Sequence, residues 1–181
     1  YTAVMQQHIK SLIRTIPDFP QPGIQFRDIT TLFNDAAGFR LTIEALAARY
    51  AGQAISKVAG IESRGFILAA PLALALGAGF VPIRKPGKLP AEWIGLDYQL
   101  EYGTDRVEVH VDAIGRDERV LLVDDLIATG GTALAAATLI ETLGGKVVEC
   151  AFVIDLPALG GRKRLSAGGY GSIALCAFDG E

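Results

Sequence analysis

The sequence predicts an α/β fold in which helices flank a central parallel sheet. Apolar stretches of strand length occur at 57–61, 79–84, 120–123 and 147–154. Ala-rich segments of helical length lie between them, at about 65–76 and 131–143. Strands that alternate with helices in this way form parallel sheets with both faces covered.

The chain before the first of these strands is predicted to hold two helices joined by a stiff loop. The positions with helical spacing in residues 1–16 are Val4, His8, Ile9, Leu12, Ile13 and Ile16. Three prolines and a glycine exclude regular structure in 17–23. Asp35 is a typical N-cap for the second helix, which Gly52 would close.

Residues 97–111 follow a different pattern. Val107, Val109 and Val111 alternate there with polar residues. Such alternation is typical of an antiparallel ribbon with one face in water. We expect this ribbon to form a flap beside the main sheet, and 85–95, which has weak periodicity, to be a mobile loop.

Length and charge restrict the classes of protein and partner. A chain of 181 residues, half of them hydrophobic, suits one globular domain. The net charge of −3 offers no attraction to nucleic acid or to an anionic membrane surface. The longest apolar stretch, 66–80, contains Pro71 and is shorter than the roughly 20 residues that cross a bilayer. We therefore expect no nucleic-acid partner and no membrane partner.

The cysteines and the start of the sequence favour a cytoplasmic protein. Cys150 and Cys176 lie in apolar runs, where buried thiols are expected rather than a disulfide or a ligand pair. The first 16 residues lack the basic start and apolar block of a signal peptide. His8 and His110 have no partner at metal-ligand spacing, so no metal site made by the protein alone is predicted.

The most informative segment is 120–132, with the sequence Val-Leu-Leu-Val-Asp-Asp-Leu-Ile-Ala-Thr-Gly-Gly-Thr. A buried strand leads there into two carboxylates, a loop of small residues and the start of a helix. Free N–H groups and the dipole at a helix start attract phosphate, and glycines let the backbone approach it. Carboxylates accept hydrogen bonds from vicinal sugar hydroxyls. The segment therefore predicts a sugar-phosphate cradle, although an acidic strand end and a helix cap would look alike. The cradle residues are Asp124, Asp125, Ala128, Thr129, Gly130, Gly131 and Thr132.

As a unit, this segment resembles the signature with which type I phosphoribosyltransferases bind 5-phosphoribosyl-1-pyrophosphate (PRPP). Neither G-x-x-x-x-G-K-[ST] nor G-x-G-x-x-G occurs in the chain, so the P-loop and dinucleotide-binding alternatives lose their fingerprints. The resemblance implies a type I fold in a single domain, 1–181, with an N-terminal helix and hood in 1–34 and a flexible flap in 85–111. It also implies Mg²⁺ as cofactor, held mainly by PRPP oxygens and water.

A second anion site is expected for the pyrophosphate of PRPP. Two segments that follow apolar strands carry suitable groups, Glu62-Ser63-Arg64-Gly65 and Arg84-Lys85-Pro86-Gly87-Lys88. Arg64 precedes a helix and so combines a guanidinium with backbone donors, which also suits it to stabilise the leaving group in catalysis. The alternative for the second segment is a solvated basic loop. By resemblance, the peptide bond entering Arg64 is expected to be cis. The predicted pyrophosphate ligands are Ser63, Arg64, Arg84, Lys85 and Lys88.

The segment 17–28 resembles the hood of the adenine-specific branch of the family, and 83–90 and 100–104 resemble the same branch. Phe26 offers an aromatic face to a purine, and the backbone at Gln25 and Arg27 offers a donor and acceptor edge. The resemblance implies an apolar residue on the opposite face, for which Leu156 is our candidate and Leu159 the fallback. Phe26 and Leu156 could instead be ordinary core residues.

The resemblance also implies an activity and an assembly. Glu101 resembles the flap glutamate that manages the proton at the purine ring, and Tyr102 lies beside it in the flap. The implied reaction joins adenine to PRPP to give AMP and pyrophosphate, and the implied assembly is a homodimer. Two alternatives stay open: transfer to another base such as xanthine or orotate, and a PRPP-sensing regulator. The regulator would need a DNA-binding module, and the 16 residues before Pro17 hold only two basic side chains.

Overall fold

The computed structural model describes residues 2–100 and 102–180, and its centre is a parallel sheet. In this part of the chain, five strands are hydrogen-bonded in the order β4-β3-β7-β8-β9, and each neighbouring pair is parallel. Their bounds are β3 (Lys57–Ile61), β4 (Gly79–Ile83), β7 (Arg119–Ile127), β8 (Lys146–Asp155) and β9 (Ser172–Ala177). The predicted α/β fold is confirmed, whereas β9 is an addition that the apolar runs did not predict.

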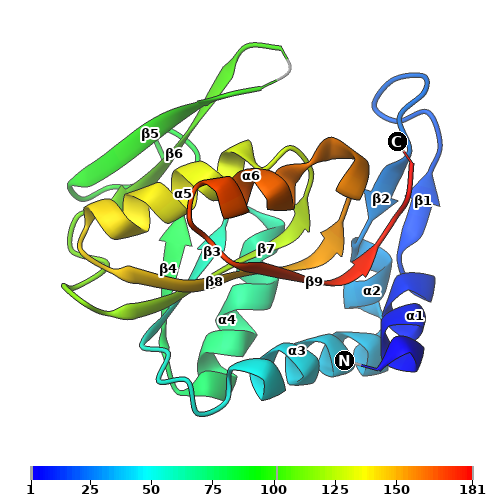
Figure 1. Ribbon diagram of the computed structural model, residues 1–181, viewed down its shortest axis with the longest axis horizontal. Helices are drawn as coiled ribbons and strands as arrows, with labels where there is room; N and C mark the ends of the chain where they lie inside the picture. The colour runs from blue at the N-terminus through cyan, green and yellow to red at the C-terminus, as the bar shows by residue number, and fades with distance from the viewer. Residues whose placement is uncertain (1, 101, 181) are drawn as a thin grey trace.

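Helices cover both faces of this sheet (Figure 1). One face is covered by α1 (Ala3–Ser11), α2 (Thr30–Asn34), α3 (Ala36–Tyr50) and α4 (Arg64–Leu76). The other is covered by α5 (Gly131–Thr142) and α6 (Gly161–Ala167), which follows the short 3₁₀ helix η1 (Pro157–Leu159). The helices predicted at about 65–76 and 131–143 are thus confirmed as α4 and α5.

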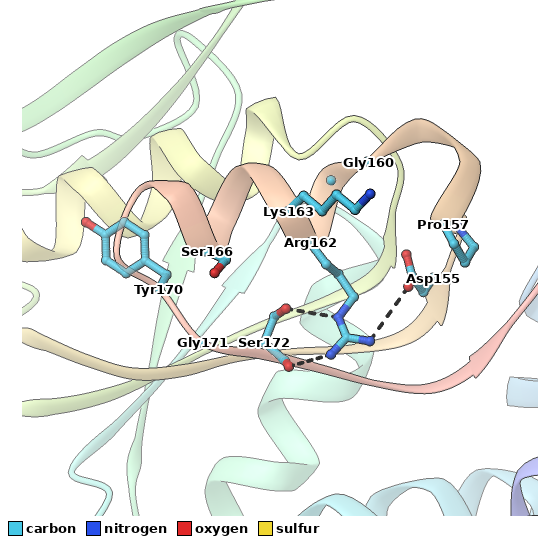
Figure 2. Close-up of a pocket in the computed structure, with 10 residues that line it drawn as sticks. Asp155, Pro157, Gly160, Arg162, Lys163, Ser166, Tyr170, Gly171 and Ser172 are labelled. Carbon is cyan, nitrogen blue, oxygen red and sulfur yellow. Dashed lines mark hydrogen bonds and ion pairs between the residues drawn. The ribbon is translucent and has the colours of Figure 1, made fainter.

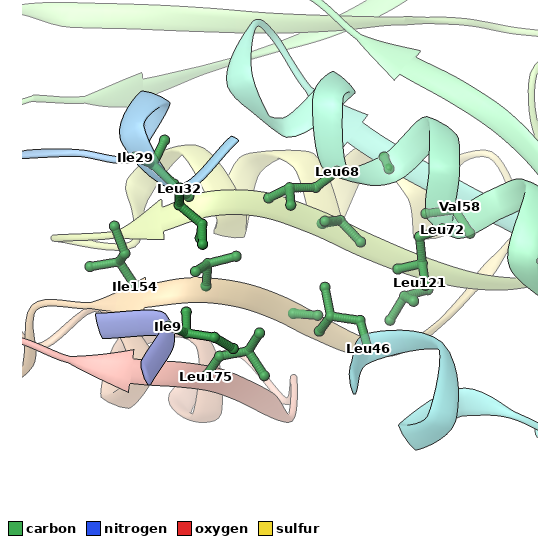
Figure 3. Packing of buried hydrophobic residues seen from close by; sticks show 14 of the residues in the cluster. Ile9, Ile29, Leu32, Leu46, Val58, Leu68, Leu72, Leu121, Ile154 and Leu175 are labelled. Atoms are coloured by element: carbon green, nitrogen blue, oxygen red, sulfur yellow. The ribbon is translucent and has the colours of Figure 1, made fainter. Parts of the chain in front are cut away.

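Aliphatic side chains fill the space between the sheet and helices α1–α4 (Figure 3). Leu46, Leu68 and Leu72 reach in from the helices, and Leu121 and Ile154 from the strands. Each of these side chains is essentially inaccessible to solvent. Burial of one such side chain stabilises the fold by about 1.5–3 kcal/mol, so the sheet is a rigid base for the loops at its edge.

Two antiparallel hairpins lie at opposite ends of the sheet (Figure 1). The first joins β1 (Arg14–Ile16) to β2 (Phe26–Asp28), and α1, which precedes it, packs against β9. The second joins β5 (Trp93–Gln99) to β6 (Thr104–His110), and a bridge between Arg84 and Glu108 ties it to the end of β4. The antiparallel ribbon expected in 97–111 is therefore confirmed, but it begins earlier, at Trp93, within the segment 85–95 that was expected to be a loop.

The expectation of helical spacing through residue 16 was wrong. Helix α1 ends at Ser11, and Arg14–Ile16 form a strand instead. The cause is a partner distant in sequence: Ile16 pairs with Phe26, and the Arg14 guanidinium bonds the Asp28 carboxylate. The N-cap at Asp35 is confirmed, since its carboxylate accepts the Gly38 N–H at 2.7 Å.

Both cysteines are buried free thiols, as expected for their apolar surroundings. Burial raises the pKa of Cys150 and of Cys176 to about 12, which keeps both protonated at neutral pH. Within residues 2–100 and 102–180, no helix is long and apolar enough to span a bilayer.

Candidate active site

The predicted cradle lies where the strand order reverses. From β3 the chain moves outward to β4 at one edge, and from β7 it moves through β8 to β9 at the other. Ligands of open α/β sheets bind beyond the strand ends at such a point. A cavity of about 180 Å³ opens there between the end of β7 and the start of α5. All seven predicted cradle residues line it, together with Arg64, which follows β3.

The two carboxylates of the cradle belong to β7 itself, because the strand continues to Ile127 rather than ending at Val123. Asp125 is 6% exposed, and its Oδ2 accepts the Arg64 Nε–H at 2.6 Å. Asp124 Oδ1 accepts the Asp125 backbone N–H at 2.8 Å. Burial, together with the negative charge of Asp125, raises the pKa of Asp124 well above its usual range. The site therefore holds one carboxylate paired with Arg64 and, beside it, a second carboxyl group whose pKa is raised.

The loop after β7 requires glycine for two reasons. Gly130 has φ +84°, a left-handed conformation that side chains disfavour, and it is the N-cap of α5. A Cβ at Gly130 would also lie 2.8 Å from the Gly161 carbonyl oxygen, at the start of α6. Ala128 accepts the Gly161 N–H at 3.0 Å. Helix α6, which the sequence patterns did not predict, thus supports the cradle from behind.

The predicted pyrophosphate ligands lie at the ends of the paired strands β3 and β4. Ser63 is the N-cap of α4 but makes no side-chain cap hydrogen bond, so its hydroxyl is left for other partners. The cis peptide bond lies between Glu62 and Ser63, one bond before the position expected from the resemblance. That expectation was therefore wrong by one residue.

Glu62 organises the basic segment, a role that the sequence patterns did not predict. Its carboxylate accepts the Lys85 backbone N–H at 2.7 Å and the Arg84 guanidinium at 3.1 Å. Although burial opposes it, these bonds keep the pKa of Glu62 below its usual value. Lys85 donates its ammonium to Tyr98 and Asp105, whereas Lys88 is exposed. The signal that could have identified Glu62 was its place directly after a buried strand.

The predicted base ligands come from two distant parts of the chain. Phe26 is half-buried and meets the edge of Phe19 with a ring-centroid distance of 5.2 Å. Gln25 and Arg27 flank it. Leu156 is also half-buried, and its backbone N–H donates to Ile127 at the end of β7 at 3.1 Å. Leu156 is thereby fixed beside the strand that carries the carboxylates.

Phe178 connects the first hairpin to the segment that holds Leu156. The Arg27 guanidinium lies over the Phe178 ring, 4.5 Å from its centroid. The Phe178 backbone N–H donates to the Asp155 carbonyl at 3.0 Å. Arg27 and Leu156 are therefore brought into one region by an aromatic residue that follows the last strand. Sequence reasoning missed Phe178 because nothing local marks such a contact.

Tyr102 is 82% exposed at the tip of the second hairpin. Glu101, the predicted flap glutamate, lies outside the described residues.

A second hollow, of about 380 Å³, lies between η1, α6 and β9 (Figure 2). Arg162 crosses it, donating to Ser172 Oγ at 3.1 Å and lying 3.8 Å from Asp155 Oδ2. Burial raises the pKa of Asp155. None of the predicted site residues lines this hollow, so it supports the segment around Leu156 without belonging to the cradle.

A cradle at the switch point of a parallel sheet, with basic groups at the adjacent strand ends, defines a phosphoribosyltransferase. The family model described as phosphoribosyl transferase domain matches residues 33–168.

Relatives along almost the whole chain identify the branch. An adenine phosphoribosyltransferase of Methylobacillus flagellatus is 66% identical over 172 residues, which are 95% of this chain and 98% of the relative. The crystal structure of the adenine phosphoribosyltransferase of Rhodothermus marinus is 53% identical, with a TM-score of 0.92 over 98% of this chain and 100% of that one. The Saccharomyces cerevisiae enzyme, solved with an imino-altritol bisphosphate and adenine, is 39% identical, with a TM-score of 0.90 over 96% and 99%. The chain belongs to the adenine phosphoribosyltransferase family.

Proposed function

We propose that this chain transfers the 5-phosphoribosyl group from PRPP to adenine, giving AMP and pyrophosphate, and so serves purine salvage. The observation that carries the proposal is the cavity lined by Arg64, the carboxylate pair and the glycine loop. The yeast relative with adenine and a bisphosphate in its structure supports the choice of substrates.

PRPP would bind through its ribose and 5′-phosphate to the cradle. Asp124 and Asp125 can bond the vicinal ribose hydroxyls, and the Arg64 guanidinium holds the Asp125 carboxylate in place. The loop from Ala128 to Thr132 would hold the 5′-phosphate, with hydroxyl donors from Thr129 and Thr132 and backbone N–H donors from the start of α5.

The pyrophosphate leaving group would be met by Ser63, Arg64, Arg84, Lys85 and Lys88. Negative charge grows on its oxygens as the bond to the ribose C1 breaks, so fixed cations beside it lower the barrier. Arg64 is the group that we assign a catalytic role here, because it is the first residue of α4 and its guanidinium bonds Asp125 in the cradle.

The donors present fit Mg²⁺ as cofactor. Carboxylate oxygens are ligands that Mg²⁺ accepts, and the cradle supplies two carboxyl groups. We propose that PRPP oxygens and water supply most of the ligands of the ion. When bound, the ion would neutralise charge on the pyrophosphate.

Adenine would lie between Phe26 and Leu156. The Phe26 ring and the Leu156 side chain can cover the two faces of a purine, while the backbone at Gln25 and Arg27 reads its edge. This arrangement presents adenine N9 to the ribose C1 in a fixed orientation, opposite the departing pyrophosphate. Glu101 would act as the general acid or base at the purine ring, and Tyr102 would move over the ring when the flap closes.

We further propose a single domain, 1–181, with 1–34 as hood and 85–111 as flap, that works as a cytoplasmic homodimer. Three exposed apolar side chains on α4 and β4 support dimerisation, namely Ile67, Leu74 and Phe80. Two unpaired cysteine thiols suit a reducing compartment.

The test is AMP formation from PRPP and Mg²⁺ with adenine, in parallel with hypoxanthine, guanine, xanthine and orotate. We expect turnover with adenine alone, and its loss in the Asp124→Asn/Asp125→Asn double variant. Turnover with a different base would contradict the assignment of Phe26 and Leu156. PRPP binding without turnover on any base would instead support a PRPP-sensing protein.

A further inference from the structure

Lys85 forms a polar triangle with two residues of the second hairpin, Tyr98 and Asp105. Its ammonium donates to the Tyr98 hydroxyl at 2.9 Å and to Asp105 Oδ2 at 2.5 Å. The Tyr98 hydroxyl donates to the same carboxylate oxygen at 3.0 Å. Asp105 Oδ1 accepts the Arg106 backbone N–H at 2.8 Å, which fixes the carboxylate in turn. All groups of the triangle are therefore fixed relative to one another.

The triangle also touches the cradle. Tyr98 is buried, and a Cβ added at Gly131 would lie 3.2 Å from its ring atom Cδ2. Gly131 begins α5 and lines the cradle cavity. The Tyr98 ring thus packs against the loop assigned to the 5′-phosphate, while its hydroxyl bonds the lysine assigned to the pyrophosphate.

The Lys85 ammonium keeps the capacity for one more bond. An ammonium has three N–H donors, and two of them are used within the triangle. The Lys85 side chain is 36% exposed, so the third can reach an acceptor from outside. Although burial opposes it, the bonds to Asp105 and Tyr98 raise the pKa of Lys85, so the amine remains charged. A free lysine side chain would lose much of its rotamer freedom on binding an anion, whereas this one is already ordered.

We propose that Asp105, together with Tyr98, is a positioning residue for pyrophosphate binding: it holds the Lys85 ammonium in place, with one N–H left for a pyrophosphate oxygen. The proposal rests on the proposed function, because it takes Lys85 as a pyrophosphate ligand. Lys88 is exposed, and within residues 2–100 and 102–180 no such triangle holds it. Pyrophosphate binding by Lys85 should therefore depend more on neighbouring residues than pyrophosphate binding by Lys88.

The experiment is a double-mutant cycle between Asp105→Asn and Lys85→Met in the full chain. Pyrophosphate affinity and the KM for PRPP are measured, with AMP affinity as a readout that lacks pyrophosphate. We expect Asp105→Asn to weaken pyrophosphate binding and raise the KM for PRPP about tenfold, the size of one charge-assisted hydrogen bond. AMP affinity should stay unchanged, and Asp105→Asn should have no further effect once Lys85 is Met.

A matched control separates positioning from general loss of charge. Asp117→Asn makes the same substitution in another carboxylate paired with a lysine, Lys146, at 3.5 Å. It should leave pyrophosphate binding as in the unmodified chain. If Asp105→Asn fails to fold, Tyr98→Phe replaces it in the double-mutant cycle with Lys85→Met, because this variant removes the hydroxyl from the triangle and keeps the ring against Gly131.

Three results would overturn the proposal. The first is an unchanged KM for PRPP in Asp105→Asn. The second is a rise in this KM that is equally large when Lys85 is already Met. The third is a lower KM for PRPP in Asp105→Asn, which would mean that Asp105 competes with pyrophosphate for the lysine. Failure of the proposed function is distinguishable, because the unmodified chain would then form no AMP from PRPP and adenine.

Discussion

Gly130 joins β7 to α5 in a left-handed conformation and touches the start of α6. We expect Gly130→Ala to lower the free energy of unfolding by about 2 kcal/mol or more, because a Cβ adds backbone strain and a clash with the Gly161 carbonyl. PRPP affinity should fall as well. Chemical unfolding and calorimetric PRPP titration measure the two effects.

Gly169→Ala is the control for that prediction. Gly169 also has a positive φ, +93°, but a Cβ there would meet nothing within 4 Å. This variant should show the strain alone, about 1 kcal/mol, with PRPP affinity intact. Equal losses of stability in both variants would contradict a role for the contact with α6.

Asp28 makes the free energy of unfolding depend on pH in the acidic range. Hydrogen bonds from Thr30 and from Arg14 lower the pKa of this buried carboxyl from 3.8 to about 2. Because the folded pKa lies below the unfolded one, the stabilisation is complete above about pH 5 and is lost as pH falls towards 2. It amounts to about 2 kcal/mol.

The measurement for Asp28 is urea unfolding of the unmodified chain and of Asp28→Asn between pH 7 and pH 2.5. The difference in unfolding free energy should be largest at pH 7 and should shrink as the pH falls below about 4. A difference that stays constant across this range would show that the carboxylate charge of Asp28 is not what stabilises the fold.

At the scale of elements, the second hairpin is the segment expected to move. It is tied to the end of β4 through Arg84 and Glu108, while Tyr102 at its tip is largely exposed. We expect PRPP with Mg²⁺ to slow chymotryptic cleavage after Tyr102 several-fold, because closure would shield the tip. Adenine alone should protect much less. Equal cleavage rates with and without PRPP would argue against closure.

The sequence predicted those elements whose signal is local. The cradle is one uninterrupted run from Val120 to Thr132, so strand, carboxylates, glycines and helix start could all be recognised together. The Ala-rich helices α4 and α5 were predicted for the same reason. Strand β1 was not, because Arg14–Ile16 continue a helical spacing and become a strand only by pairing with Phe26–Asp28.

The supporting parts of the site could not be predicted from the sequence, because their contacts join distant residues. Glu62 acts through Arg84 and Lys85, more than twenty positions away. Asp105, on β6, accepts a hydrogen bond from the ammonium of the same Lys85, twenty positions earlier in the chain. No spacing rule links such pairs, so only the packed structure identifies them.

At the scale of the whole molecule, the exposed apolar surface of α4 and β4 predicts self-association. Leu74 is 84% exposed, and Ile67 and Phe80 are exposed nearby in the sequence. We expect Leu74→Glu to dissociate the proposed dimer into monomers, because a carboxylate cannot be buried there without a partner. Size-exclusion chromatography with light scattering measures the mass.

Val4→Glu is the matched control for the surface. Val4 is 80% exposed on α1, away from α4 in the sequence, and takes the same change of charge. It should leave the mass unchanged. A dimer that survives Leu74→Glu, or that Val4→Glu also dissociates, would contradict α4 as the interface.

The contact between Arg27 and Phe178 has a practical consequence for anyone who handles this polypeptide. The ring of a residue near the end of the sequence lies beneath the strand assigned to recognise the base, and Figure 1 shows the two segments side by side. We therefore expect an affinity tag, a fluorescent fusion or a proteolytic cut after β9 to change the selectivity for the base more than the affinity for the sugar phosphate. Attachments are better made on the surface loop between β6 and β7, which is far in the chain from the first hairpin and from Phe178.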